Sequence, residues 1–312
     1  MTDSDEFWSF FWEIRLRELE DLGKREAILA TSKLVRSLGE RPDQPVRLLE
    51  LGCGEGQIIG VLVEAHVQLH SISDSLGVDY SPRAIEKCRH TFPEMSFQIG
   101  DFTDRDFMAN LGFFEILLLV NALHEVFSAS WSPKIGEVAV PAAKERVRQA
   151  LAMAVEHLAP QGYLVLFDGL EPSANLDAAI RIRFRHWQAR RRFDAFALEY
   201  RPFHIAYRQL EDPLCVALSQ RDFTRYITKS IFLEKRLWQT ERLESYQYFT
   251  QDEFQSVLKD LGLEISTLRT LTANYGKWQD EVEIETPGVE FPAEHILILA
   301  HKPGGFQDAR AG

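Results

Sequence analysis

Three glycines at alternate positions, Gly52, Gly54 and Gly56, follow directly after an apolar stretch of the chain. Residues 46–51 (VRLLEL) are short and apolar, which is typical of a buried parallel strand. Residues 57–66 then carry apolar side chains at helical spacing. The glycines therefore fall where a strand ends and a helix begins, and glycine permits backbone conformations there that other residues rarely adopt. In a doubly wound sheet, a ligand meets the N-terminal amides of a helix at such a turn.

The spacing of these glycines distinguishes two cofactors. A dinucleotide-binding turn has the pattern GxGxxG, which would require glycine at position 57, but the chain has Gln57. The pattern present is Glu50-x-Gly52-x-Gly54-x-Gly56, which resembles the ExGxGxG signature of class I methyltransferases that use S-adenosylmethionine (SAM). The alternative is a tight strand-to-helix turn that binds no cofactor.

An acidic residue ends the next strand-like segment, residues 76–82 (LGVDYSP). Asp79 lies 25 residues after Gly54, about where such a sheet places a carboxylate on a ribose. Tyr80 beside it offers a flat face. The alternative for Asp79 is a helix cap, although Ser81, followed by proline, is itself a good cap.

The resemblance implies further cofactor contacts after the third and fourth strand-like segments, residues 95–104 and 113–127. Asp101 would receive the adenine amino group, and Phe102 would pack on the adenine ring. The resemblance also places Asn121 in the cofactor site. Together with Glu50, the three glycines, Asp79 and Tyr80, these residues form the predicted SAM site.

Five strand-like segments alternate with helical patterns, which predicts an α/β fold. The resemblance implies a doubly wound, seven-stranded, mostly parallel sheet preceded by N-terminal helices. A capped amphipathic helix from Thr250 to about Leu261, stopped by Gly262, and strand-like runs at 263–272 and 294–302 fit the end of such a sheet. We expect an N-terminal helical cover at residues 1–45 and the SAM-binding core at residues 46–172. A helical insertion between the fifth and sixth strands, residues 173–248, would form a lid. The C-terminal part of the core sheet would follow at residues 249–304, with a flexible tail at residues 305–312.

Two segments outside the core carry unusual side chains. Residues 7–14 have an aromatic amphipathic pattern, which predicts a helix that either packs on the core or covers the substrate. Residues 181–193 hold six arginines, and we expect a helix with Arg181, Arg185 and Arg192 on one face. That face is either the solvated edge of a lid helix or a fork that recognises a carboxylate or phosphate.

Composition limits the partners and the location of this 312-residue chain. The formal net charge of -12 disfavours binding to nucleic acid or to an anionic membrane surface. The three cysteines form no CxxC pair, so we expect no metal site, no disulfides and a reducing, cytoplasmic location. No apolar run is long enough to span a membrane. The sequence leaves a homo-oligomer open.

These features predict an enzyme that transfers a methyl group from SAM to a small molecule, with oxygen slightly favoured over nitrogen as the acceptor atom. His124 is the preferred general base, because it follows the fourth strand and titrates near neutral pH; the alternative is a histidine of the pocket wall or a helix cap. Glu125 ranks lower, as a residue that either orients His124 or faces solvent. The other functional hypotheses are methylation of RNA or of a protein side chain, and SAM binding without turnover.

Overall fold

The computed structural model describes residues 22–38, 46–67, 74–172 and 177–304. The aromatic helix expected at residues 7–14 and the tail expected at residues 305–312 lie outside these ranges. Within them, no helix is long and apolar enough to cross a membrane.

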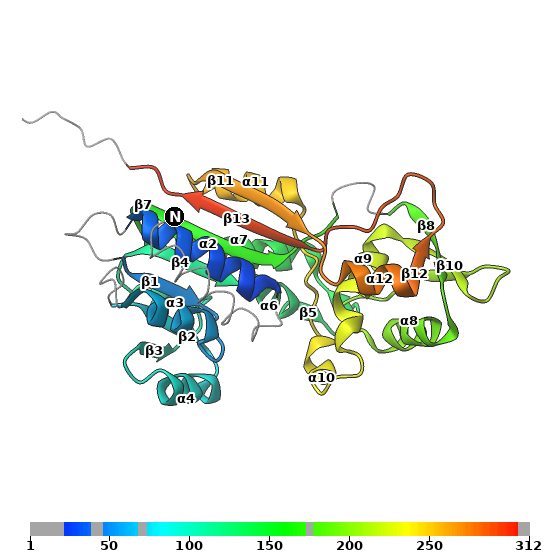
Figure 1. The fold of residues 1–312 in the computed structure, drawn as a ribbon, viewed down its shortest axis with the longest axis horizontal. Helices are drawn as coiled ribbons and strands as arrows, with labels where there is room; N and C mark the ends of the chain where they lie inside the picture. The colour runs from blue at the N-terminus through cyan, green and yellow to red at the C-terminus, as the bar shows by residue number, and fades with distance from the viewer. Residues whose placement is uncertain (1–21, 39–45, 68–73, 173–176, 305–312) are drawn as a thin grey trace, which may run out of the picture.

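A seven-stranded sheet forms the centre of the described part of the chain (Figure 1). Its strand order is β11-β13-β7-β4-β1-β2-β3, and β13 alone runs antiparallel to its neighbours. This confirms the predicted doubly wound, mostly parallel sheet. The strands are β1 (Leu48–Leu51), β2 (Leu76–Asp79), β3 (Ser96–Ile99), β4 (Phe114–Val120), β7 (Leu158–Gly169), β11 (Glu264–Leu271) and β13 (His295–His301).

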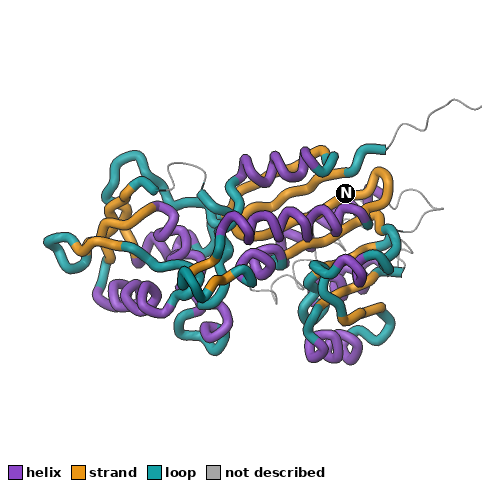
Figure 2. Tube along the Cα trace, turned by 180° about the vertical axis from the view of Figure 1, so that it is seen from behind, coloured by secondary structure: helices purple, strands orange, loops and turns teal. Residues whose placement is uncertain are grey.

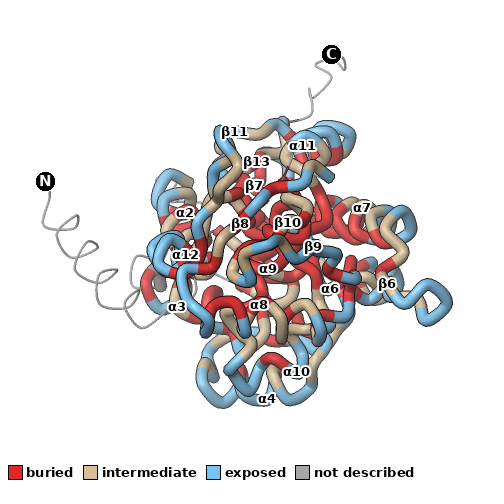
Figure 3. The backbone as a smooth tube through the Cα atoms, turned by 90° about the vertical axis from the view of Figure 1, so that its right-hand side faces the viewer, coloured by how far each residue is buried: buried red, intermediate tan, exposed pale blue. Residues whose placement is uncertain are grey.

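Alternation along the strands builds a hydrophobic core on each face of the sheet. On β1, Leu48 belongs to the core beneath one helical layer, whereas Leu49 and Leu51 belong to the other. The first layer consists of α2 (Leu22–Leu38), α3 (Gln57–Val67) and α4 (Pro82–Thr91). The second consists of α5 (Arg105–Met108), α6 (Leu123–Ser128), α7 (Val140–Glu156) and α11 (Gln251–Asp260). Figure 3 shows that buried residues concentrate in the interior and exposed ones at the outer turns.

The strand order places a topological switch point between β1 and β4. The chain proceeds from β1 outward to β2 and β3, and then returns to the other side of β1 through β4. The crevice beyond the carboxyl ends of these two strands is the usual ligand site of such sheets. The glycine turn follows β1 directly, so the sequence motif lies at this crevice.

The insertion forms a second lobe beyond one end of the central sheet (Figures 1 and 2). It contains the helices α8 (Trp187–Glu199), α9 (Gln220–Lys229) and α10 (Trp238–Glu241), with a 3-10 turn at Ser230–Phe232. It also contains strands that the sequence analysis did not predict. These are β8 (Ala179–Phe184), β9 (Tyr207–Gln209) and β10 (Cys215–Ser219), and with β12 (Val282–Ile284) from the C-terminal segment they form an antiparallel sheet of order β12-β8-β10-β9.

The helix expected over residues 181–193 is therefore wrong in its first part. Ile180, Ile182 and Phe184 alternate with arginines, and they are fully buried on the inner face of β8. The helix begins only at Trp187, after the side chain of His186 accepts a hydrogen bond from the N–H of Ala189.

Two arginines of this segment, Arg181 and Arg183, lie on the outer face of β8. Arg183 pairs with Asp212 and Glu285, and Arg181 also pairs with Glu285. These ion pairs lie within the second lobe, so neither arginine is held ready for an acceptor. The expected grouping of Arg181, Arg185 and Arg192 on one helical face does not form, because the first two precede the helix.

The expected boundary at residue 249 also needs correction. After β11, the chain returns to the second lobe as α12 (Tyr275–Glu281) and β12, and β12 pairs with β8. Only then does β13 complete the central sheet. The C-terminal segment thus contributes to both lobes. Its first helix is as expected, since Thr250 and Glu253 form a capping box at the start of α11 and Gly262 follows its end with a φ of +74°.

Candidate functional site

The three glycines form a turn that a side chain would disrupt for different reasons. All have positive φ angles, of +76° at Gly52, +53° at Gly54 and +72° at Gly56. A Cβ atom at Gly52 would approach Ala122 to 2.8 Å, and one at Gly56 would approach the ring of Phe97 to 2.9 Å. A Cβ atom at Gly54 would meet no atom within 4 Å. Gly54 therefore stays bare towards open space, as a cradle for a ligand requires.

Asp79 is tied to the glycine turn. One carboxylate oxygen accepts the N–H of Gly54 and the other accepts the N–H of Ser81, both at 2.8 Å. Ser81, not Asp79, is the cap of α4, because its hydroxyl oxygen accepts the N–H of Ala84. The alternative interpretation of Asp79 as the helix cap is therefore wrong. Each carboxylate oxygen of Asp79 keeps a further lone pair with which to accept a ligand hydroxyl.

Glu50 lies beneath the turn, with only 2% of its surface exposed. Its carboxyl accepts the N–H of Ile59 in the first turns of α3 at 3.0 Å. Burial raises the pKa of Glu50 to about 8, although this hydrogen bond opposes the shift. Glu50 therefore holds the start of α3 and contributes an ionisable group at the floor of the site.

The remaining predicted cofactor residues lie at the ends of neighbouring strands. Tyr80 is 66% exposed and Phe102 is buried. Asp101 accepts hydrogen bonds from both the N–H and the hydroxyl of Thr103. Asn121 has a φ of +53°, and its buried Oδ1 has no partner among the described residues. A buried acceptor without a partner is costly, so this atom is well placed to receive a donor from a ligand.

These residues line one cavity of about 930 Å³. Of the predicted cofactor residues, all except Gly56 contribute to its walls. Among the described residues, the ionisable acids that line it outnumber the bases. The acids are Glu50, Glu55, Asp79, Asp101, Glu125 and Glu244; the bases are Lys24 and Arg146. This charge suits SAM, whose sulfonium and ammonium groups outweigh its one carboxylate.

The cavity also has walls that sequence reasoning missed. These walls come from the last part of the insertion: Leu237, Leu243, Glu244 and Tyr246. They lie more than 100 residues beyond the fourth strand in sequence, and no local motif marks them. Lys24 reaches the cavity from α2, where it donates to the side chain of Gln57 at 2.5 Å.

The predicted base, His124, does not line this cavity. It is 2% exposed, and its Nδ1 lies 2.9 Å from Asp168 while its Nε2 lies 3.7 Å from Glu244. Burial lowers the pKa of His124, but the charge and hydrogen bond of Asp168 and the contact with Glu244 raise it to about 9 overall. An imidazole that is protonated and buried at neutral pH is poorly suited to accept a proton. The pocket-wall alternative does not fit either, because His124 lies behind the lining residues, between Asp168 and Glu244.

Glu125, ranked lower from the sequence, does line the cavity. Its carboxyl makes no hydrogen bond or ion pair with the residues that the structure describes. Glu125 is exposed by its surface area, but the surrounding protein atoms still desolvate its carboxyl and raise its pKa to about 7, with contributions from the charges of Glu244 and Asp79 and opposition from His124. A carboxylate that titrates near neutral pH is suited to general base catalysis.

Comparison with known proteins agrees with this geometry. Residues 42–172 match a family model described as a methyltransferase domain. No curated protein matches the sequence. A SAM-dependent methyltransferase from Clostridium acetobutylicum ATCC 824 is 12% identical with a TM-score of 0.47, over 97% of this chain and 100% of that one. The N-methyltransferase NodS from Bradyrhizobium japonicum WM9 is 13% identical with a TM-score of 0.44, over 92% and 91%.

The CurJ carbon methyltransferase is 14% identical with a TM-score of 0.46, and the match covers 89% of this chain but 54% of that one. This chain therefore spans about half the length of that protein. Similarity at this level transfers neither an acceptor nor catalytic residues. The family match and the glycine turn tied to Asp79, which lines the cavity, assign residues 42–172 to a methyltransferase domain whose cofactor is S-adenosylmethionine.

Proposed function

We propose that this chain transfers the methyl group of SAM to a small-molecule acceptor. One observation carries the proposal: a single cavity is lined by the cofactor residues and also by Leu237, Leu243, Glu244 and Tyr246 from the insertion side. Its volume of about 930 Å³ lies within the range typical of small-molecule sites. Cofactor and acceptor would share this space, so the insertion side selects the acceptor.

The residues of the chain mainly align the acceptor and manage its proton. When bound, SAM would supply an electrophilic methyl group, which an acceptor atom attacks in line with the departing sulfur. Asp79, Asp101 and Asn121 would hold the cofactor, and the walls of the cavity would exclude water from the reacting atoms. We assign Glu125 as the group that takes the acceptor's proton, since it is the candidate base that lines the cavity.

The charges at this end of the cavity support a choice between the two candidate acceptor atoms. The preference for oxygen depended on His124 as a base for a hydroxyl, and the burial of His124 removes that support. Two carboxylates, Glu125 and Glu244, instead favour a protonated amine, which they would attract as a cation. Glu125 would then take one proton from the ammonium and leave a neutral nitrogen to attack the methyl group. Oxygen remains the second candidate, with Glu125 in the same role.

The competing functions meet specific objections. RNA is disfavoured by the excess of carboxylates in the cavity and by the net charge of -12. SAM binding without turnover would give no methylated product, which the labelling experiment below measures.

Labelled SAM provides the test. The purified chain is incubated with a cell extract and SAM that carries an isotopic methyl group, and the extract is then analysed by mass spectrometry. Label in low-molecular-weight amines is the expected result, and label in hydroxyl compounds would support the second candidate. Label confined to RNA or protein, or no label at all, would contradict the proposal.

A further inference from the structure

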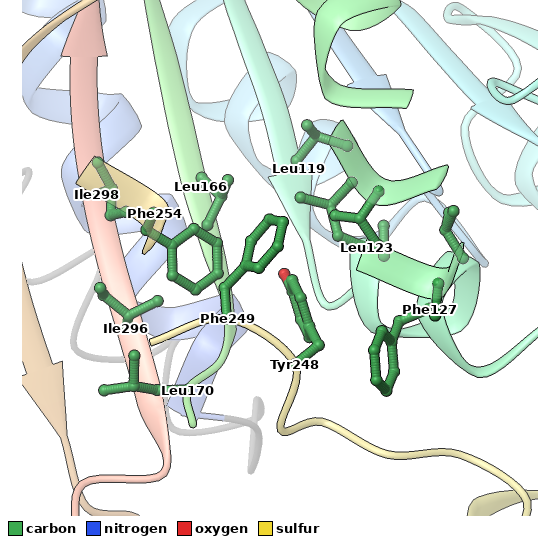
Figure 4. Close-up of a cluster of buried hydrophobic side chains, with 14 of the residues drawn as sticks. Leu119, Leu123, Phe127, Leu166, Leu170, Tyr248, Phe249, Phe254, Ile296 and Ile298 are labelled. Carbon is green, nitrogen blue, oxygen red and sulfur yellow. The ribbon is translucent and has the colours of Figure 1, made fainter. Parts of the chain in front are cut away.

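The segment where the insertion ends and the chain returns to the core, residues 243–250, packs across the carboxyl ends of the core strands. We call it the return segment. Figure 4 shows its Tyr248 and Phe249 between the side chains of β7 and β13 and those of α6. The carbonyl of Phe249 accepts the N–H of Glu171, just beyond β7, at 2.9 Å. The backbone of Tyr246 lies close to Gly169. A Cβ atom added at Gly169 would fall 2.0 Å from the carbonyl oxygen of Tyr246.

His124 lies where the return segment meets the core. Asp168 at the end of β7 binds its Nδ1 on one side, and Glu244 of the return segment faces its Nε2 on the other. The ring of Tyr246 stacks on the imidazole, with 3.8 Å between ring centroids. The backbone supports the same junction, because the hydroxyl of Ser128 donates to the carbonyl of His124 and accepts the N–H of Ser245.

Opposite charges from several elements meet at this junction. Lys229 at the end of α9 is fully buried; its Nζ lies 2.6 Å from Glu241, 3.5 Å from Glu244 and 4.0 Å from the ring centroid of Tyr246. The groups that face His124 are thus the carboxylates of Asp168 and Glu244, the ammonium of Lys229 and, on its own helix, Glu125. Glu244 is partly buried, and these cationic partners stabilise its charged form.

We propose that His124 is a positioning residue that clamps the return segment to the core and so fixes Glu244 and Tyr246 as walls of the acceptor end of the cavity. This inference rests on the proposed function, because the acceptor end of the cavity is defined by it. The experiments that test the clamp do not require the proposed function to be correct. As an imidazolium, His124 donates to Asp168 and offers its second N–H to Glu244, whereas a neutral ring would lose one of the two donors. The histidine adjacent to the cavity therefore acts through its neighbours and does not touch the acceptor.

Hydrogen exchange measured by mass spectrometry tests the clamp. The full chain is saturated with S-adenosylhomocysteine, and wild type is compared with His124→Gln and Asp168→Asn. We expect amides of the return segment to exchange about tenfold faster in both variants, because their local opening becomes easier. The glycine turn should keep its exchange rate, and affinity for S-adenosylhomocysteine by calorimetry should stay within about twofold.

His157→Gln is the matched control. His157 is also buried, at 9% exposure. Its Nδ1 lies 3.0 Å from the carbonyl oxygen of Gly112, which is not part of the return segment. This variant should leave exchange of the return segment unchanged. Unchanged exchange in His124→Gln would overturn the proposal. Faster exchange throughout the core with lost S-adenosylhomocysteine binding would overturn it too, since His124 would then support the whole fold.

The imidazole of wild type gives a second readout that does not depend on a folded variant. In protein with ¹⁵N-labelled histidine, the nuclear magnetic resonance signal of His124 should report a protonated ring at pH 7, and Glu244→Gln should lower its pKa. A neutral ring at pH 7 would contradict the clamp. None of these measurements uses an acceptor, so failure to find a methylated product would count against the proposed function alone.

Discussion

The backbone N–H of Gly54 donates to Oδ2 of Asp79 at 2.8 Å. This bond joins the glycine turn after β1 to the acidic residue at the end of β2. The two parts of the cofactor motif, separated by a helix in sequence, therefore form one unit in space. A ligand bound by the carboxylate of Asp79 is also held against the bare backbone of Gly54.

Replacement of Asp79 should weaken the binding of SAM. Asp79→Ala removes an acceptor for ribose hydroxyls and releases the N–H of Gly54, so we expect a loss of about 1–3 kcal/mol in binding free energy. Calorimetry with SAM measures it. Asp104→Asn is the control, because Asp104 caps α5 and does not line the cavity. Equal affinity in Asp79→Ala and wild type would show that Asp79 serves the turn alone.

Alanine at two of the glycines should separate folding from binding. Gly56→Ala brings a methyl group into contact with Phe97 and Cys88, so strain and crowding should destabilise the fold by roughly 2–4 kcal/mol. Gly54→Ala meets no atom and should cost only about 1–2 kcal/mol of backbone strain. Its methyl group would occupy the ligand cradle, so SAM affinity should fall about tenfold or more. Denaturant unfolding and calorimetry distinguish the two; similar profiles would refute the division.

The cofactor half of the site could be predicted because its signals are local. Strand ends, glycines and acids follow each other within short stretches, and parallel strands bring their carboxyl ends to one edge. The acceptor half could not be predicted in the same way, since Glu244 and Tyr246 reach the cavity only through long-range packing. The burial and charge of His124 depend on Asp168 and Glu244, which no spacing in the sequence connects to it.

The missed strand β8 had a readable signal. Ile180, Ile182 and Phe184 recur with period two, which is typical of a strand with one buried face. The helical interpretation followed the arginines, which continue into α8 and obscure the change of period at Trp187. In contrast, β12 lies more than 90 residues beyond β8, and its pairing in the second lobe depends on tertiary structure.

Glu50 should make the stability of the fold decrease as pH rises. Its pKa increases from 4.5 to about 8 on burial, so the folded state binds a proton that the unfolded chain has lost. The stability present below pH 4.5 is then lost progressively as pH rises through about 8. Glu50→Gln should remove this dependence and exceed wild type by on the order of 4 kcal/mol above pH 8, while matching it near pH 4.5. Unfolding in denaturant across this range, with the exposed Glu86→Gln as control, provides the measurement.

Glu125→Gln should lower turnover and leave cofactor binding intact. If Glu125 takes the acceptor's proton, kcat should fall by about 10²–10⁴-fold, because an amide cannot accept that proton at neutral pH. With the acceptor identified from labelled SAM, steady-state kinetics and calorimetry measure both quantities. Glu94→Gln, an exposed residue outside the cavity, is the control. Turnover near the wild-type rate would assign the reaction to alignment alone.

The leucines on the insertion side of the cavity should contribute to acceptor binding. Leu243 is 49% exposed, although it lines the cavity, and an acceptor bound beside it would cover this apolar surface. Complete burial of a leucine contributes about 1.5–3 kcal/mol, so Leu243→Ala should forfeit about 1 kcal/mol and raise KM for the acceptor roughly fivefold. The KM for SAM should remain unchanged, because the predicted cofactor contacts come from the core strands. Leu198→Ala provides the matched control, since Leu198 is 76% exposed on α8 and does not line the cavity. An increase in both KM values would instead place Leu243 against the cofactor, and no change in either would move the acceptor away from the insertion.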